Sequence, residues 1–160
     1  MKAIGNFIFA GSATIGVMNT GLFEVDRILE ITDEIVEQNA KHFIHNYPEI
    51  PVVVPSTWEA EGYREQLRNL NIDLLYGNPP CSGLSQLSRN ASLESSVNKH
   101  FYRTFDNIMA IRPKVFLLEN APTTIKLGYP ILKDMINQLS EHYRFTIIRD
   151  RGANRGVSMQ

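Results

Sequence analysis

The residues best suited to chemistry lie between Tyr76 and Ser85, a stretch that holds the chain's single cysteine, Cys81. A short apolar run, residues 72–75, precedes it and is typical of a buried strand. Gly77 and two prolines then end regular structure and fix the backbone. A thiol held at the carboxyl end of a strand is a candidate nucleophile, because α/β sheets bind their ligands at such ends. A lone cysteine can equally be a small buried apolar residue, so the rest of the chain must decide.

Three more predicted strands end in glycine or polar residues: Gly11 and Ser12 after residues 6–10, Glu30 near the end of 23–31, and Glu119 and Asn120 after 114–118. In a parallel sheet these ends share one edge, so the side chains can converge on one cleft. Each residue alone is a weak signal, since a glutamate at a strand end is more often a solvated surface residue. The combination, in this order, points to a site.

Strands and helices alternate along the chain. Further strands are predicted at 52–54, 72–76 and 144–150, and helices at 12–20, 33–43, 56–69, 99–111 and 130–142. This alternation predicts a doubly wound α/β fold, with a mostly parallel sheet and helices on both faces. The sequence Ser-Thr-Trp-Glu at 56–59 matches a capping box. Residues 82–98, rich in Ser, Asn and Gly, predict a mobile surface loop.

Length and composition exclude several classes of protein. The chain has 160 residues, 43% hydrophobic and 21% charged, which suits one soluble globular domain. One cysteine excludes an internal disulfide and a cysteine-based zinc site, and fits a reducing cytoplasm. No apolar run approaches the roughly 18 residues that span a membrane. The N-terminus is too short and polar for a secretory signal. The net charge of −1 places the main nucleic-acid surface, if one is needed, outside these residues.

Taken together, the motifs resemble those of the cytosine-5 DNA methyltransferases. Residues 9–13, Phe-Ala-Gly-Ser-Ala, are similar to the family's F-x-G-x-G cofactor motif. Residues 80–85, Pro-Cys-Ser-Gly-Leu-Ser, are similar to its P-C-Q-x-x-S nucleophile motif, and Glu119-Asn120-Ala121 to its E-N-V motif. The resemblance covers nearly the whole chain and implies a Rossmann-like, S-adenosylmethionine-dependent methyltransferase fold.

The resemblance implies a covalent mechanism. Cys81 would add as thiolate to carbon 6 of a flipped cytosine, so that carbon 5 can attack an electrophilic methyl group. Glu119 would stabilise the charge that develops on the ring, from a desolvated pocket. Asn120 would orient the loop around Cys81. Substrate contacts are expected from Ser82, Gly83 and Ser85.

The methyl donor implied by the resemblance is S-adenosylmethionine, and no metal is expected. Its expected binding residues lie at the strand ends and are Phe9, Gly11, Ser12, Glu30, Ile31, Thr57, Asn78 and Pro80. Glu30 would bind the ribose hydroxyls and Phe9 the adenine. The chain departs from the family pattern at Ala13, which replaces a glycine, and at Ile31, where an aromatic residue is common.

The tail at 154–160 is similar to the start of the family's Q-x-R-x-R region and ends at its glutamine. We therefore expect residues 1–160 to form a catalytic and cofactor-binding domain that is incomplete at its C-terminus and lacks the target-recognition region. Such a chain is an N-terminal fragment or needs a complementing chain. Its partner would be double-stranded DNA, and its compartment the cytoplasm of a prokaryotic or phage-type system. Alone, it should methylate DNA poorly and expose an apolar face.

Two alternatives stay open at this point. The triplet Asn78-Pro79-Pro80 is similar to the N-P-P-aromatic motif of methyltransferases that act on exocyclic amino groups, although Cys81 stands at the aromatic position. The chain could also be a non-catalytic, cofactor-binding fragment or subunit in which Cys81 is idle.

Overall fold

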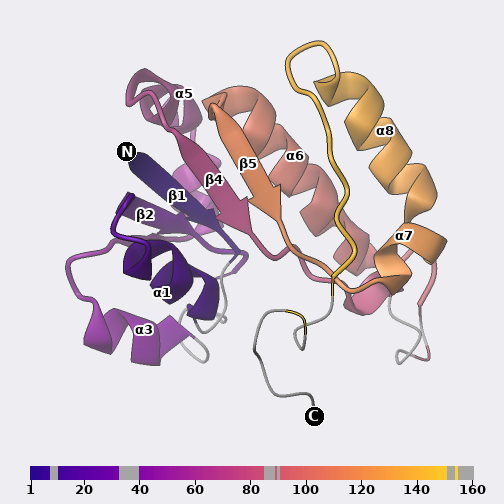
Figure 1. Cartoon of the computed structure of the whole chain (residues 1–160), viewed down its shortest axis with the longest axis horizontal. Coiled ribbons are helices and arrows are strands. Elements are labelled where there is room, and N and C mark those ends of the chain that lie inside the picture. Colours follow the sequence, from indigo (N-terminus) through magenta and orange to yellow (C-terminus); the bar gives the residue numbers. More distant parts are fainter. Residues whose placement is uncertain (8–10, 33–39, 85–88, 90, 151–153, 155–160) are drawn as a thin grey trace.

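The computed structural model describes residues 1–7, 11–32, 40–84, 89, 91–150 and 154 (Figure 1). Five parallel strands form one sheet in the order β3-β2-β1-β4-β5. The strands are β1 (Lys2–Asn6), β2 (Glu24–Leu29), β3 (Val52–Val53), β4 (Leu74–Gly77) and β5 (Val115–Leu118). The order runs outward from β1 on one side and from β4 on the other, so the sheet is doubly wound and its topological switch point lies between these two strands. The predicted fold class is confirmed.

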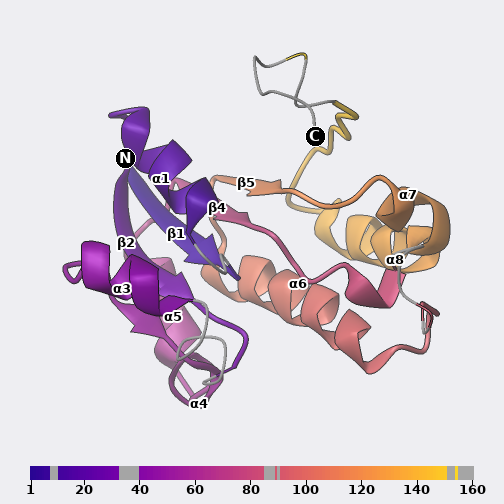
Figure 2. The same cartoon turned by 90° about the horizontal axis from the view of Figure 1, so that it is seen from below.

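Helices cover both faces of the sheet (Figure 2). One face carries α1 (Ser12–Asn19) and α3 (Lys41–Asn46), and the other α4 (Pro55–Trp58), α5 (Tyr63–Asn69), α6 (Lys99–Ile111) and α8 (Tyr129–Leu139). Neighbouring strand residues point to opposite faces, so Ala3 and Leu74 belong to one apolar cluster and Ile4 and Leu75 to the other. Three short elements complete the fold: η2 (Ser82–Leu84), η3 (Ser96–Asn98) and α7 (Thr123–Leu127).

Helix α6 has the bounds that the sequence predicts, 99–111. Its buried apolar residues Phe101, Phe105, Ile108 and Ile111 recur at helical spacing and face the sheet. The polar residues between them stay on the outer side or pair internally. This strong amphipathic pattern explains why the prediction succeeds to the residue.

The first strand was predicted at 6–10, and this was wrong, because β1 occupies Lys2–Asn6. Phe7 has a φ of 60°, which ends the extended conformation. The Phe7 amide instead bonds the carbonyl of Leu29 at 2.8 Å. Residues 8–10 lie outside the described residues.

The helix predicted at 56–69 is two helices. Helix α4 begins at Pro55, and α5 begins after Gly62, whose φ of 78° is left-handed and interrupts the helix. The predicted capping box was also wrong, since Val54 is the N-cap residue of α4 and no side chain caps it.

The sixth strand predicted at 144–150 does not form. This segment runs beside β5 (Figure 1), but no backbone hydrogen bond among the described residues joins the two. Instead, the ring of Phe116 contacts those of Tyr143 and Phe145, with centroids 5.0 and 5.7 Å apart. A cleft of about 250 Å³ separates residues 114–116 from 142–146. Without a ladder the segment stays irregular, and Ile147 and Ile148 are exposed.

Smaller differences concern element ends and loops. Helix α3 continues to Asn46, α8 ends at Leu139 rather than at 142, and α7 was not predicted. The predicted helix at 33–43 lies mostly outside the described residues. Within 82–98, the two short helices η2 and η3 form, and Gly83, Leu84 and Asn98 are buried, so this is not simply a surface loop.

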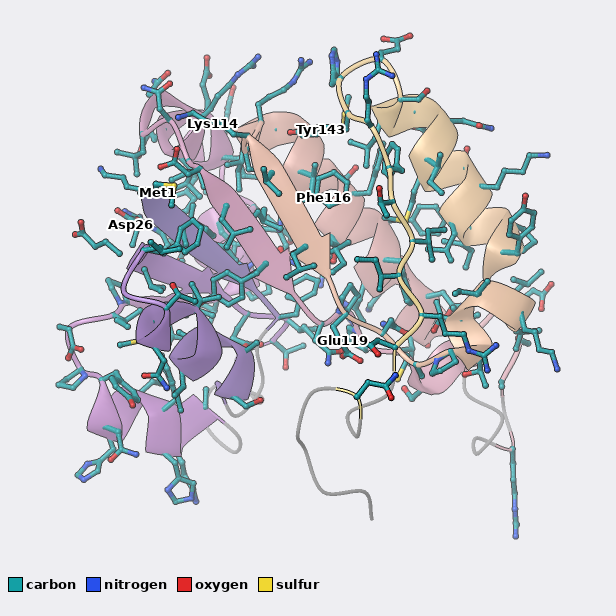
Figure 3. All side chains as sticks on the ribbon, viewed as in Figure 1. Met1, Asp26, Lys114, Phe116, Glu119 and Tyr143 are labelled. Carbon is teal, nitrogen blue, oxygen red and sulfur yellow. The ribbon has the colours of Figure 1, made fainter. Side chains whose placement is uncertain are left out.

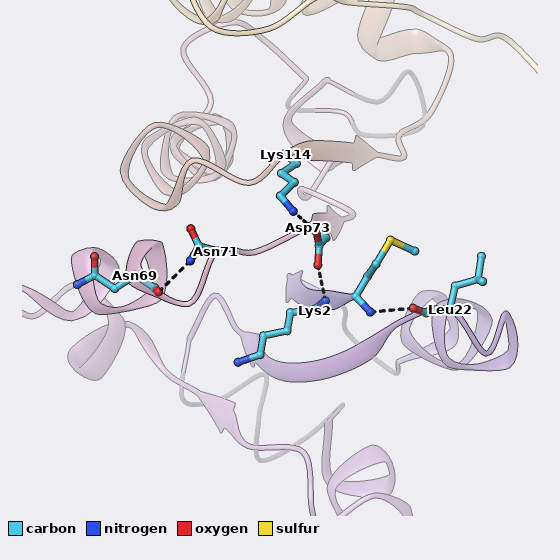
Figure 4. A network of polar contacts seen from close by, with 7 residues as sticks. Lys2, Leu22, Asn69, Asn71, Asp73 and Lys114 are labelled. Atoms are coloured by element: carbon cyan, nitrogen blue, oxygen red, sulfur yellow. Dashed lines mark hydrogen bonds and ion pairs between the residues drawn. The ribbon is translucent and has the colours of Figure 1, made fainter.

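At the amino ends of the strands, Asp73 ties three strands together (Figure 4). Its carboxylate accepts the Lys2 amide and the Lys114 ammonium, each at 2.7 Å. The hydrogen bond from Lys114, followed by that from Lys2, lowers the pKa of Asp73. The network holds β1, β4 and β5 at the edge opposite the predicted site.

Candidate active site

The carboxyl ends of β1, β4 and β5 approach one another at Gly77. A β-carbon at Gly77 would lie 2.0 Å from the carbonyl oxygen of Asn6, so only glycine allows this approach. The Glu119 amide bonds the Gly77 carbonyl at 2.9 Å, and the Asn78 amide bonds the Phe7 carbonyl at 3.3 Å. Backbone contacts thus bring the segment before Cys81 and the Glu119 segment to one place.

Cys81 carries a free, half-buried thiol directly before η2. Its carbonyl accepts the Leu84 amide at 2.9 Å, which closes the turn. Pro79 is buried and Pro80 half-buried. The thiol therefore sits on a short, fixed turn at the end of β4, where the sequence predicts it.

Asn120 links the two segments. Its amide nitrogen donates to the Pro79 carbonyl at 2.7 Å. Its side-chain oxygen accepts the Ala121 amide at 3.0 Å and the hydroxyl of Thr124. Because both the nitrogen and the oxygen of its side-chain amide are hydrogen-bonded, Asn120 holds the backbone two residues before Cys81 in a defined position.

Glu119 lies at the end of β5 (Figure 3) and is exposed. The predicted desolvated pocket around it was wrong for this structure. Its carboxylate Oε2 accepts the Asn78 side-chain amide at 2.6 Å. The sequence assigned Asn78 to the cofactor, whereas here its side chain contacts the glutamate.

The cofactor side of the site is built from β1, α1 and β2. Gly11 has a φ of 91° and is the N-cap of α1, and no side chain among the described residues caps the helix, an arrangement in which first-turn amides can bind an anion. A β-carbon at Gly11 would meet the Phe43 ring at 2.4 Å. Ser12, next to it, is exposed. This uncapped turn fits the carboxylate of an amino-acid ligand.

Glu30 follows β2 and is fully buried. Its carboxylate Oε2 accepts the Ile31 amide at 3.2 Å, and its carbonyl accepts the indole Nε1–H of Trp58 at 2.8 Å. Ile31 is buried, and Thr57 is exposed on α4 beyond β3. The predicted cofactor residues of the described chain therefore follow the ends of β1 to β4, and among them the side chain of Asn78 bonds Glu119 at the end of β5.

The predicted substrate residues begin the loop after Cys81. Ser82 is exposed, and Gly83 is buried so closely against Asn98 that a β-carbon would lie 2.4 Å from its Oδ1. Phe9 and Ser85 lie outside the described residues.

Two buried polar residues that support the site were not predicted. Asn98 donates to the carbonyls of Ser92 and Leu93, both at 2.9 Å, and so fixes the far end of the loop after Cys81. His100 packs edge-on against Phe7 with ring centroids 6.0 Å apart. Burial, and then the charges of Arg103 and Lys99, lower its pKa to about 4. In the sequence both read as ordinary polar residues near a helix start, and no local signal marks them.

A buried network ties α6 to the end of β1. The Asn6 amide donates to Thr104 Oγ1 at 3.0 Å, and the Asn107 amide donates to Asn6 Oδ1 at 2.8 Å. The carboxyl end of β1 is thus anchored from the face opposite α1.

Within the described part of the chain, no three His, Cys, Asp or Glu side chains cluster to hold a metal ion. The helices described there are also too short or too polar to cross a bilayer.

A doubly wound sheet with a glycine-initiated first helix, and hydrogen bonds that join the segment before Cys81 to Glu119 and Asn120, are the architecture of a Rossmann-like methyltransferase domain. The profile of the C-5 cytosine-specific DNA methylase family matches residues 7–147. The chain therefore belongs to this family, which decides against the exocyclic-amino alternative.

Relatives and solved structures agree. The type II methyltransferase M.HindV of Haemophilus influenzae is 31% identical over 140 residues, which are 86% of this chain and 42% of the relative. M.XorII of Xanthomonas oryzae pv. oryzae is 26% identical over 84% of this chain and 32% of its own length. A structure described as a prophage-encoded DNA modification methyltransferase (E. coli) has a TM-score of 0.68 and 26% identity, covering 90% of this chain and 39% of that one. DNMT2 of Spodoptera frugiperda shares the fold, with a TM-score of 0.62 at 16% identity over 88% of this chain and 40% of its own. The chain thus spans less than half the length of each.

Proposed function

We propose that this chain supplies the catalytic and cofactor-binding part of a DNA cytosine-5 methyltransferase. The observation that carries the proposal is the hydrogen bond from Asn120 to the Pro79 carbonyl, which fixes the Cys81 turn beside Glu119. Family membership supports the reaction class, and this geometry supports the choice of residues for it.

In the proposed reaction, the Cys81 thiolate adds to carbon 6 of a flipped cytosine, and Glu119 holds the ring at nitrogen 3 while charge develops there. Carbon 5 then takes a methyl group, loses its proton to a base, and the carbon–sulfur bond breaks to return the thiolate. Flipping the base costs roughly a few kcal/mol, which contacts to DNA must offset.

S-adenosylmethionine, when bound, would supply the electrophilic methyl group. The uncapped first turn of α1 at Gly11 and Ser12 suits its carboxylate, and Glu30 suits its ribose hydroxyls. Phe9, Ile31, Thr57 and Pro80 remain predicted contacts, because only their position at the strand ends supports them.

The covalent step is tested with a duplex that contains 5-fluorocytosine, which blocks loss of the proton and traps the adduct. The protein is a chimera of residues 1–160 joined to the part of the Haemophilus relative that follows its matched region. We expect a cofactor-dependent protein–DNA adduct that Cys81→Ser abolishes and that Ser140→Ala, an exposed change at the C-terminal end of α8, leaves intact. An adduct that survives Cys81→Ser would refute the assignment.

Glu30 and Glu119 should separate binding from chemistry. Glu30→Ala should weaken cofactor binding, measured by calorimetry, by about 10-fold or more, because a buried carboxylate is lost. Glu119→Gln should leave cofactor binding nearly unchanged and lower the single-turnover rate by about 100-fold or more. Equal losses in both quantities for Glu119→Gln would indicate a structural role.

We further propose that DNA recognition needs polypeptide beyond these 160 residues, in the same chain or a second one. The relatives are more than twice as long, and the net charge of −1 gives little phosphate affinity. Val115 and Leu117 of β5 are 58% and 61% exposed. Their neighbours Leu74 and Tyr76 on β4, which point to the same face of the sheet, are buried. Both faces of a parallel sheet are normally covered, so this bare face suits the missing part.

Tritium transfer from labelled S-adenosylmethionine to mixed-sequence DNA tests this second proposal. Residues 1–160 alone should give background transfer, and the chimera should give transfer that depends on Cys81. Robust, Cys81-dependent transfer by residues 1–160 alone would overturn it.

A further inference from the structure

The side chain of Asn78 offers the carboxylate of Glu119 a short hydrogen bond. The distance from Asn78 Nδ2 to Glu119 Oε2 is 2.6 Å, at the short end of the range for charge-assisted bonds. Among the described residues, Asn78 is the one hydrogen-bond partner of this carboxylate. The bond joins two residues that are 41 positions apart in the chain.

The backbone places Asn78 before its side chain acts. Its backbone amide donates to the Phe7 carbonyl at 3.3 Å. Gly77, the residue before it, packs closely against the Asn6 carbonyl. Pro79 after it restricts Asn78 to extended backbone conformations. Glu119, in contrast, is exposed and would otherwise sample many rotamers. The fixed partner therefore orders the mobile one.

From this geometry we propose that Asn78 is a positioning residue for Glu119. It holds Oε2 and leaves Oε1 to meet the target base. The inference rests on the function proposed above, and it replaces the cofactor contact that the sequence predicts for Asn78. Asn78 acts through Glu119 and need not touch the base or the methyl donor.

A second hydrogen bond crosses in the opposite direction, because Asn120, next to Glu119, donates to the carbonyl of Pro79, next to Asn78. The two bonds form a reciprocal pair between the Cys81 segment and the Glu119 segment. Together they fix the spacing between thiol and carboxylate, which a base held between the two groups requires.

The chemistry demands an amide at position 78. Alanine removes the donor, and aspartate keeps the shape but presents an acceptor of like charge to Glu119. The aspartate variant therefore gives a readout that loss of packing would not.

The kinetic test uses the chimera and its Asn78→Ala and Asn78→Asp variants. We expect Asn78→Ala to lower kcat by about 10- to 100-fold, with KM for DNA and for S-adenosylmethionine within about twofold of the unsubstituted chimera. Asn78→Asp should lower kcat by more than Asn78→Ala does, because it places a second carboxylate against Glu119. The matched control Asn137→Ala, an exposed asparagine of α8, should change neither constant. Unchanged kcat in Asn78→Ala, or a loss confined to KM for S-adenosylmethionine, overturns the proposal.

A measurement on residues 1–160 alone separates this inference from the proposed function. In nitrogen-15 spectra, the side-chain amide protons of Asn78 should exchange with solvent at least about 10-fold more slowly than those of exposed Asn137. Glu119→Ala should abolish that protection, and Asn137 should not respond. If the unsubstituted chimera is inactive, the proposed function fails, and this spectrum alone decides on Asn78. Equal exchange of Asn78 with and without Glu119 overturns the inference.

Discussion

His100 should make the folded chain sensitive to mild acid. The side chain is 8% exposed, packs against Phe7, and has a buried Nδ1 with no hydrogen-bond partner among the described residues. Burial lowers its pKa from 6.5 to about 4. In the unfolded chain His100 therefore takes up a proton near pH 6.5, whereas in the folded chain it does so only near pH 4.

The size of the effect follows from this pKa difference. A residue whose pKa is lower in the folded state favours unfolding as the pH drops below its unfolded value. Each pH unit between the two pKa values costs about 1.4 kcal/mol, so lowering the pH from 7.5 to 4.5 should remove about 2.5 kcal/mol of stability. Below pH 4 this contribution stays constant, because both states are then protonated.

The assay is urea unfolding of residues 1–160, followed by far-UV circular dichroism at half-unit steps from pH 7.5 to 4.5. His100→Phe keeps an aromatic ring against Phe7 and cannot take up a proton. The free energy of unfolding of this variant should therefore fall less over that range than that of the unsubstituted chain, by about 2.5 kcal/mol. His45→Phe, an exposed change on α3, is the matched control and should follow the unsubstituted chain.

The reasoning fails if the His100→Phe and unsubstituted chains lose the same stability over this range. Should His100→Phe not fold, His100→Leu provides the same comparison with a smaller side chain.

Two further outcomes concern the ends of the sheet. Gly77→Ala should destabilise the chain by about 3 kcal/mol in thermal unfolding, because the new methyl group overlaps the Asn6 carbonyl. Gly16→Ala in α1, where the added methyl group meets open space, should instead stabilise the chain by about 0.5–1 kcal/mol. Equal effects of the two substitutions would refute the close approach at Gly77. Asp73→Asn should lower Tm at pH 7, where the charged carboxylate of Asp73 binds Lys114. The difference in Tm between this variant and the unsubstituted chain should shrink as the pH falls below about 3.8 and through the lowered pKa of Asp73. A difference in Tm that stays constant with pH would contradict the pairing.

Local sequence predicted those parts of the fold that local patterns determine. Helix α6 matches its prediction because apolar residues repeat at helical spacing along it. The first strand was misplaced because the positive φ of Phe7, which ends β1, leaves no mark in the apolar pattern of the sequence. The strand at 144–150 was not found because an apolar pattern does not specify backbone pairing, and no backbone hydrogen bond among the described residues joins this segment to β5.

The site shows the same division. The motifs around Cys81 and Glu119 were predicted from neighbouring residues, and the parallel sheet brings them together. The bond from Asn78 to Glu119, and the support that Asn98 gives to the loop, arise from contacts across the fold. Single-residue types in a sequence carry no sign of such pairs.

Trp58 gives the protein an optical property of its own. It is the chain's single tryptophan, is fully buried, and donates its indole N–H to the carbonyl of Glu30 while its ring lies 6.2 Å from that of Phe7. Indole emission responds to the polarity around the ring and to this hydrogen bond. Its intensity and wavelength therefore report on the surroundings of Trp58, which include Glu30, Phe7 and Arg103 of α6, without a label and without background from any other indole. A titration with S-adenosylmethionine that is followed by tryptophan fluorescence therefore reports changes around Trp58.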